Sequence, residues 1–326
     1  MSGGVQHVEV SRDDDGQRLD RWLQKQGLPF FIIQKVIRKG QVRVDGKRAK
    51  ANQRLVAGQD VRVPPFVPQD KDAKPELSEA DRAFIKSLVI YDEGGIVALN
   101  KPAGLATQGG TNIRHHIDGM LDGLADKDGV RPRLVHRLDK DTSGLLLLAR
   151  SAEMARELGR IFQGHHIRKI YWAVTVPAPE MNEGTIRAPL RKAGAPGNEK
   201  TIVDPEDGQE ATTLFEVVER AGKKAAFVAF WPRTGRTHQV RVHAAYMNCP
   251  LLGDGKYGGR AASLDGLDLV RRVHLHARQI SFFHPVSQKR ISIQAPLPPD
   301  LQKTWATLGF DARGGDRVFA DIQLSR

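Results

Sequence analysis

The segment from His136 to Gly144 places an acidic side chain, Asp139, in a polar turn directly before the apolar run Leu145 to Leu148. A turn that leads into a buried strand presents its side chains on a rigid support, as many catalytic loops do. An ionised carboxylate held there can act as a nucleophile or as a general base. The same residue types also occur in calcium loops, in phosphotransfer sites and in ordinary capping turns.

A calcium loop fits this segment poorly. Asp139, Asp141 and Ser143 match its first ligand positions, but the twelfth position requires a bidentate Glu. Arg150 stands at that position, and a cation there repels calcium.

A phosphotransfer site fits poorly too, although Asp139 and Asp141 have the spacing of the two aspartates in haloacid-dehalogenase phosphatases. That arrangement has an apolar strand leading into the first aspartate. Here His136 and Arg137 precede Asp139, and the apolar run follows it. A plain turn with a capping aspartate remains as the structural alternative.

Composition indicates the partner and the compartment. The 326 residues carry a formal net charge of +12, and a field of that sign attracts a polyanion such as nucleic acid. The single cysteine, Cys249, excludes an intrachain disulfide or a cysteine-cluster metal site and favours the reducing cytoplasm. Residues 1–15 lack an apolar core, and no run of eighteen apolar residues occurs, so we expect no export signal and no membrane span.

Most of the positive charge lies between Gly16 and Val63, where twelve Lys and Arg face three Asp. Apolar residues at helical spacing predict two short helices, the second of which ends at Gly40. Asp45-Gly46 predicts a type I′ hairpin, and Val61 to Val63 predicts a further strand. The pattern resembles the small RNA-binding domain of the ribosomal-protein-S-four type, which implies that this segment grips RNA.

Proline and polar residues between 64 and 77 predict a linker after this domain. We therefore expect a tail over 1–15, the RNA-binding domain over 16–63, the linker over 64–77, a catalytic domain over 78–310 and a C-terminal extension over 311–326. Ser78 is a predicted helix cap, and a second helix is expected between Ser151 and Gly164. Residues 191–200 and 253–268 are Gly-rich and weakly periodic, which predicts surface loops.

Six sequence blocks, taken together, resemble the RluA, RluC and RluD family of pseudouridine synthases. The blocks are Asn100 to Gly104, His136 to Gly144, Lys169 to Val174, Arg233 to His243, Leu251 to Asp254 with Tyr257-Gly258, and Leu275 to Ala277. One departure is Gln108, where members of the family commonly have His. The resemblance implies an α+β fold with a mixed, mainly antiparallel sheet flanked by helices and loops.

The resemblance also implies a reaction, in which a uridine in RNA is isomerised without a cofactor. Asp139 matches the family's catalytic carboxylate, and Arg241 matches the cation that keeps that carboxylate ionised in a dry pocket. Tyr171 has the place beneath the uracil, where its ring stacks and its hydroxyl helps to remove the last ring proton. Arg137 has the place of a wedge that fills the stack left by the flipped base.

We expect further substrate contacts from five more residues, which are His136, Lys101, Thr142, Arg236 and His238. The spacing of the histidines, with no carboxylate or thiol to complete a set, argues against a metal site. Overall likeness favours the RluC type, and hence 23S ribosomal RNA, or an assembly intermediate that contains it, as the substrate of a cytoplasmic monomer. A different ribosomal or transfer RNA site, or a non-catalytic RNA chaperone with the same fold, are the alternatives.

Overall fold

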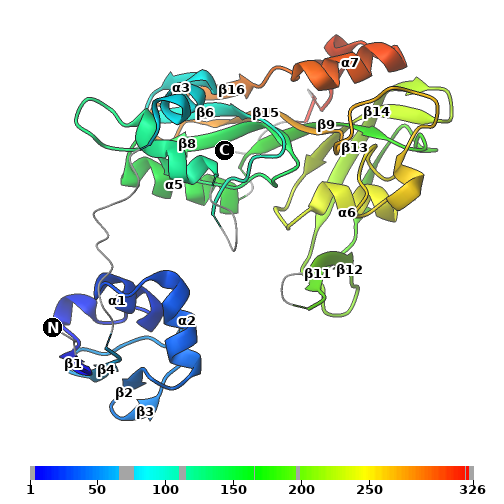
Figure 1. Cartoon of the computed structure of the whole chain (residues 1–326). Helices are drawn as coiled ribbons and strands as arrows, with labels where there is room; N and C mark the ends of the chain where they lie inside the picture. Colours follow the sequence, from blue (N-terminus) through cyan, green and yellow to red (C-terminus); the bar gives the residue numbers. More distant parts are fainter. Residues whose placement is uncertain are drawn as a thin grey trace. The chain divides into compact units, whose positions relative to one another are not determined.

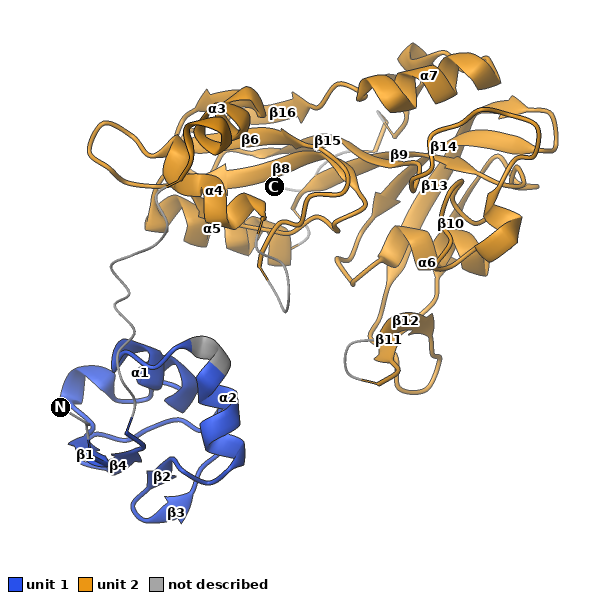
Figure 2. Ribbon diagram, viewed as in Figure 1, with its two compact units in different colours: residues 1–76 blue, residues 77–326 orange. Residues whose placement is uncertain are grey.

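The computed structural model describes residues 4–65, 77–109, 115–164, 166–195, 199–319 and 321–322. The chain divides into two compact units, residues 1–76 and 77–326 (Figure 2). Most of the segment expected as a linker, residues 66–76, lies outside the described part of the chain. No helix in the described ranges is long and apolar enough to cross a membrane.

The first unit is a four-stranded sheet packed against two helices (Figure 1). The elements are β1(Gln6–Glu9), α1(Leu19–Lys25), α2(Phe30–Arg38), β2(Arg43–Val44), β3(Lys47–Arg48) and β4(Asp60–Val63), in the sheet order β1-β4-β2-β3. Leu19, Trp22 and Leu23 of α1 are fully buried, as their helical spacing predicted. Asp45 and Gly46 have φ of 48° and 73°, the positive values that a type I′ turn requires.

The expected N-terminal tail is not a free tail. Its residues Gln6–Glu9 form β1, which pairs antiparallel with β4 through Gln6↔Val63 to Glu9↔Asp60. Val10 is buried just after the strand, and its N–H donates to the carbonyl of Gln59 at 2.9 Å. The strand is mostly exposed and lacks apolar alternation, so backbone pairing with a distant strand holds it, and the sequence pattern gave no indication of it.

The second unit is built on a mixed sheet, mainly antiparallel, with the order β10-β13-β14-β9-β15-β8-β6-β5 and with β16 and β7 at its side. The strands are β5(Val89–Glu93), β6(Ile96–Lys101), β7(Arg133–Leu134), β8(Ser143–Ala149), β9(Arg168–Thr175), β10(Glu183–Arg187), β13(Thr212–Ala221), β14(Ala225–Pro232), β15(Leu275–Phe283) and β16(Arg290–Gln294). Only β15 and β8 pair in parallel among these described strands. The expected α+β fold is confirmed.

Helices flank this sheet toward both of its ends (Figure 1). They are α3(Glu79–Ser87), α4(Ile117–Met120), α5(Ala152–Gln163), α6(Gln239–Tyr246) and α7(Pro299–Leu308). The hydroxyl of Ser78 accepts from the N–H of Asp81, so the predicted cap is present, and the hydroxyl of Ser151 likewise accepts from the N–H of Met154 at the start of the expected helix. Strand β8 is buried along its whole length, which anchors the loop that precedes it.

Three segments differ from the sequence expectation. Residues 191–200, expected as a loop, contribute to a two-stranded sheet of β11(Leu190–Ala193) and β12(Lys200–Val203). In the expected loop 253–268, Asp254 is completely buried. In the expected extension 311–326, Phe319 packs on Trp231 with ring centroids 5.7 Å apart. The first segment forms a local hairpin, whereas Asp254 and Phe319 are held by Arg241 and Trp231 from elsewhere in the chain, which short-range periodicity does not reveal.

Candidate active site

The loop that carries Asp139 is clamped on both sides. Thr107 brackets Leu138, because its hydroxyl donates to the Leu138 carbonyl at 2.7 Å and lies 3.2 Å from the Leu138 N–H. The N–H of Thr142 donates to the Asp139 carbonyl at 3.2 Å and closes the turn. Gly144 has φ of 109°, and a Cβ there would collide with the backbone of Ala277. The backbone between Leu138 and Gly144 is therefore held in one conformation where it leads into β8.

Lys101 does not lie where the sequence placed it. We expected a substrate contact, but the side chain is fully buried. Its ammonium donates to the carbonyls of Pro102 and Leu105 at 2.8 Å and of Lys140 at 3.3 Å. Burial lowers the pKa of Lys101 to about 7, and the charge of Arg272 adds to the effect. Lys101 thus holds the backbone of the Asp139 loop instead of lining the pocket.

A pocket of about 540 Å³ opens beside Asp139. Apart from Lys101, all of the predicted site residues line it, which are Asp139, Tyr171, Arg241, Arg137, His136, Thr142, Arg236 and His238. They come from the 136–142 loop, from β9, from the turn between β14 and α6, and from α6 itself. Elements far apart in the sequence therefore converge on one cavity, as a single active site requires.

The turn between β14 and α6 is organised by Gln239. Its side-chain oxygen accepts from the Thr234 hydroxyl at 2.7 Å and from the Arg236 N–H at 3.0 Å. Its amide nitrogen donates to the Thr212 carbonyl at 3.0 Å, which ties the turn to β13. This buried amide fixes the wall that holds Arg236 and His238.

Asp139 is partly accessible, with 32% of its side chain exposed. Its nearest cationic or potentially cationic group among the described ion pairs is His238, whose Nε2 lies 3.9 Å from Oδ1. A carboxylate that faces the pocket at this exposure can reach a bound substrate.

Arg241 contacts other carboxylates. Its Nε and Nη2 donate to the buried Asp254 at 2.7 and 2.8 Å, and its Nη1 lies 3.6 Å from Asp141. Among the described ion pairs Arg241 has none with Asp139, so its charge acts on that carboxylate from a distance. Burial opposes the charged guanidinium, but the bonds to Asp254 outweigh it and raise the pKa of Arg241.

The sequence reasoning missed Asp254. Its motif block was recognised, yet nothing local marks an aspartate in a Gly-rich segment as the buried partner of an arginine on a helix. A buried arginine needs a buried carboxylate as its partner, and this requirement was the only feature of the sequence that could have pointed to Asp254.

Tyr171 stays protonated in the empty pocket. Burial raises the pKa of its phenol well above the ordinary value, and the negative charge of Asp139 raises it further. A reaction step that neutralises Asp139 removes this second contribution. The hydroxyl would therefore become easier to ionise after Asp139 has reacted.

Two other pocket residues have environments that limit their chemistry. The His136 ring stacks on Phe162 at 4.6 Å, and its Nε2 accepts from the Leu147 N–H at 2.8 Å. Burial lowers the pKa of His136 to about 3, so the ring is neutral where it lines the pocket. Lys169, which the sequence reasoning did not single out, also lines the pocket, and burial lowers its pKa to about 8.

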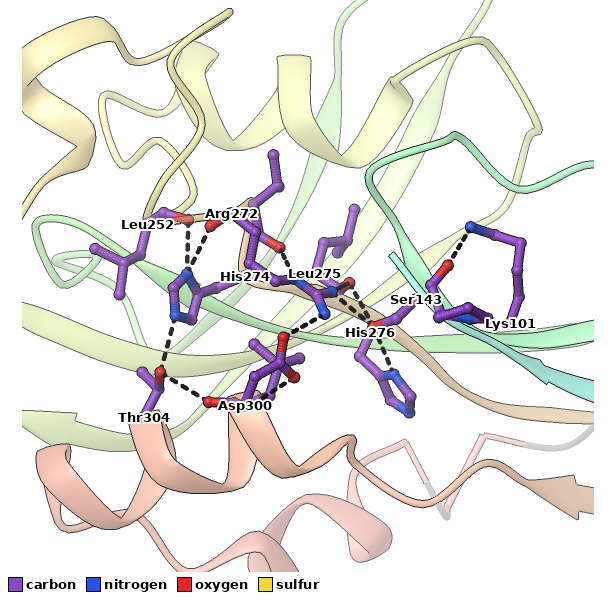
Figure 3. A network of polar contacts seen from close by, with 12 residues as sticks. Lys101, Ser143, Leu252, Arg272, His274, Leu275, His276, Asp300 and Thr304 are labelled. Carbon is purple, nitrogen blue, oxygen red and sulfur yellow. Dashed lines mark hydrogen bonds and ion pairs between the residues drawn. The ribbon is translucent and has the colours of Figure 1, made fainter. Parts of the chain in front are cut away.

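A buried polar network supports the start of β8 (Figure 3). Arg272 donates to the Ser143 hydroxyl at 2.8 Å and to Asp300 of α7 at 3.1 Å. His276 Nε2 lies 3.1 Å from the Ala295 carbonyl and therefore carries the proton, which leaves Nδ1 to accept from Ser143 at 3.0 Å. These hydrogen bonds connect α7 and β15 to Ser143, the first residue of β8 after the catalytic turn.

The described residues contain no group of three or more His, Cys, Asp or Glu that could hold a metal ion.

Comparisons with known proteins identify the family. The family model described as RNA pseudouridylate synthase matches residues 95–246. A ribosomal large subunit pseudouridine synthase C of Vibrio cholerae is 35% identical over 310 residues, which cover 92% of this chain and 95% of the relative. The protein of the same name from Escherichia coli is 33% identical over 312 residues, with coverage of 92% and 95%.

A solved structure agrees with these relatives. Human RNA pseudouridylate synthase domain containing 4 superposes with a TM-score of 0.60 and 26% identity, covering 71% of this chain and 98% of the human one. The resemblance expected from the six sequence blocks is confirmed. The chain belongs to the RNA pseudouridine synthases and is an isomerase that converts uridine to pseudouridine in RNA.

Proposed function

We propose that this enzyme isomerises specific uridines of large-subunit (23S) ribosomal RNA. The observation that carries the proposal is the convergence of Asp139, Tyr171 and Arg241 on one pocket in a chain whose relatives bear the name of large-subunit synthases. The target base must leave its stack to enter the pocket, which costs a few kcal/mol. Partly unfolded RNA, or an assembly intermediate in the cytoplasm, gives that access most easily, and one copy of the chain suffices.

Asp139 is the proposed catalytic carboxylate. The bond from ribose to ring nitrogen breaks, the uracil turns while held, and a ring carbon rejoins the sugar, so atoms and electrons balance without a cofactor. Asp139 can attack the sugar carbon, attack the ring, or assist deprotonation of the ribose on a glycal route. The position of its exposed oxygens beside the cavity is compatible with each.

Two neighbours complete the proposed mechanism. Tyr171 supports the uracil with its ring; once Asp139 has reacted, its phenol can release its own proton to solvent, and the phenolate can then accept the last ring proton. Arg137 is exposed and adjacent in sequence to the catalytic loop, so its guanidinium can fill the vacated stack and contact phosphate.

Mapping pseudouridines in cellular RNA tests the substrate. We expect specific pseudouridines of 23S ribosomal RNA, detected by chemical labelling, to disappear when the gene is deleted and to return with the wild-type gene but not with Asp139→Asn. Loss of label in transfer RNA alone would replace the proposed substrate. An unchanged map would remove the proposal altogether.

The first unit is proposed to grip the RNA backbone. Lys35 of α2 and Lys39, the residue directly after α2, are exposed one turn apart, and among the described residues neither has an acidic partner. Changing both to Gln is expected to weaken RNA binding and to reduce the slope of log affinity against log salt by up to about 1.4, since each lost phosphate contact accounts for about 0.7. Filter binding over a range of salt concentrations measures both.

The control is the same change at Lys223 and Lys224, which are exposed at the β13–β14 turn. That turn lies at the opposite end of β14 from Pro232, which lines the pocket. The control removes the same charge and should leave the slope nearly unchanged. Equal losses from both pairs would show that total charge, and not the first unit, governs binding.

A further inference from the structure

His238 stands at the start of α6 in an unusual conformation. Its backbone has φ of 55° and ψ of 21°, the left-handed region that costs energy for a residue other than glycine. This conformation sets the ring between two partners. Nε2 lies 3.9 Å from Asp139 Oδ1, and Nδ1 lies 2.7 Å from the Tyr257 hydroxyl.

Tyr257 is itself held on several sides. Its hydroxyl accepts from the N–H of Thr201 in β12 at 3.3 Å, and its backbone N–H donates to the buried Asp254 at 3.2 Å. The guanidinium of Arg241 lies over its ring, 5.2 Å from the centroid. Asp254, which binds the Arg241 guanidinium, therefore also helps to fix the Tyr257 hydroxyl that faces His238.

These contacts assign the protons. Burial raises the pKa of the Tyr257 phenol, so the hydroxyl keeps its proton and, while accepting from Thr201, can donate once. Nδ1 of His238 lies 2.7 Å away as an acceptor, and the Thr201 side chain, which also contacts the hydroxyl, can donate to it instead of accepting. The ring is neutral, because burial lowers the pKa of His238, so its one proton sits on Nε2 and faces Asp139. The other tautomer would aim a lone pair at the carboxylate.

We propose that His238 and Tyr257 are positioning residues for the catalytic carboxylate, with Tyr257 fixing the imidazole tautomer so that the Nε2–H of His238 holds Oδ1 of Asp139. The inference rests on the proposed role of Asp139. The 3.9 Å separation is longer than a hydrogen bond, and such contacts in substrate-free enzymes shorten when the substrate is bound. Holding Oδ1 leaves Oδ2 to face the ribose or the ring.

Two substitutions at His238 test this directly. An asparagine amide reaches only the place of Nδ1, whereas a glutamine amide reaches that of Nε2. If His238 matters only through its backbone conformation, the Asn variant should be the more active one, because Asn tolerates the left-handed region better than Gln. If His238 matters as a hydrogen-bond donor to Asp139, the Gln variant should be the more active one.

We expect His238→Asn to lower kcat by about 10- to 100-fold, the effect of losing one hydrogen bond to a charged group, with KM unchanged. His238→Gln should have a kcat close to that of the wild type, although its melting temperature is no higher than that of His238→Asn. Equal activity of the Asn and Gln variants would overturn the inference. An effect confined to KM would also overturn it, because such an effect indicates a direct substrate contact.

Tyr257→Phe tests the other half of the pair. It removes the hydroxyl but keeps the ring against Arg241, so we expect a smaller loss in kcat, about 5- to 10-fold, again with KM unchanged. Tyr246→Phe makes the same change at an exposed position on α6 and should have no effect. Wild-type kcat in Tyr257→Phe would contradict the inference.

Asp139→Asn is assayed in parallel to separate the two claims. An active Asp139→Asn enzyme refutes the proposed function. An inactive one, combined with wild-type rates in the His238 and Tyr257 variants, refutes the positioning pair alone.

Discussion

Replacing Asp139 with Asn is expected to lower pseudouridine formation by at least about 10⁴-fold, the scale seen when a catalytic group is removed from its site. The amide has nearly the same shape as the carboxylate but is a poor nucleophile and a poor base. The backbone of the turn is held by the Thr107 hydroxyl, the Lys101 ammonium and the Thr142 N–H, none of which uses the Asp139 carboxylate. The fold and the affinity for RNA should therefore persist.

Asp141→Asn is the matched control for that prediction. Asp141 lies in the same turn, is 52% exposed, and contacts Arg241 at 3.6 Å. Because Asp141 is half exposed and the buried Arg241 keeps both of its bonds to Asp254, this variant should lose no more than about fivefold in rate. Rates come from tritium release on RNA substrate, and binding from filter assays. Retained turnover by Asp139→Asn would refute the assignment, as would equal losses from both variants.

Local patterns in the sequence predicted the parts of the fold that neighbouring residues determine. The cap at Ser78, the helix between Ser151 and Gly164, and the hairpin at Asp45-Gly46 each depend on residues close together in the sequence, so short-range spacing was sufficient. Strand β1 was missed because its partner, β4, lies more than fifty residues along the chain and its own residues show no apolar face.

The candidate site shows the same division. Family blocks located the residues around the pocket, but they did not distinguish a residue that faces it from one that supports it. Lys101 was misplaced because a lysine beside a catalytic loop suggests a phosphate contact, whereas three backbone carbonyls surround its ammonium. Only the packing of β6 against β8 determines that orientation.

The buried pair of Arg241 and Asp254 carries the second large expected effect. Their side chains are 3% and 0% exposed, and two bonds from the guanidinium end on the same carboxylate. Asp254→Asn keeps the shape and one acceptor oxygen but leaves the arginine charge without its buried counter-ion. We expect the free energy of unfolding of the second unit to fall by about 3–5 kcal/mol, as when one partner of a buried pair is removed.

Urea denaturation followed by tryptophan fluorescence measures this loss, since Trp172, Trp231 and Trp305 lie in the second unit. Asp268→Asn is the control, because its pair with Lys303 is exposed, at 97% and 67%, and should change stability by no more than about 1 kcal/mol. A cost for Asp254→Asn as small as the control's would mean that water screens the Arg241 charge. Arg241 would then need no fixed partner, and activity should survive the change. A large cost together with lost activity would instead mean that the guanidinium beside Asp141 acts only while Asp254 holds it.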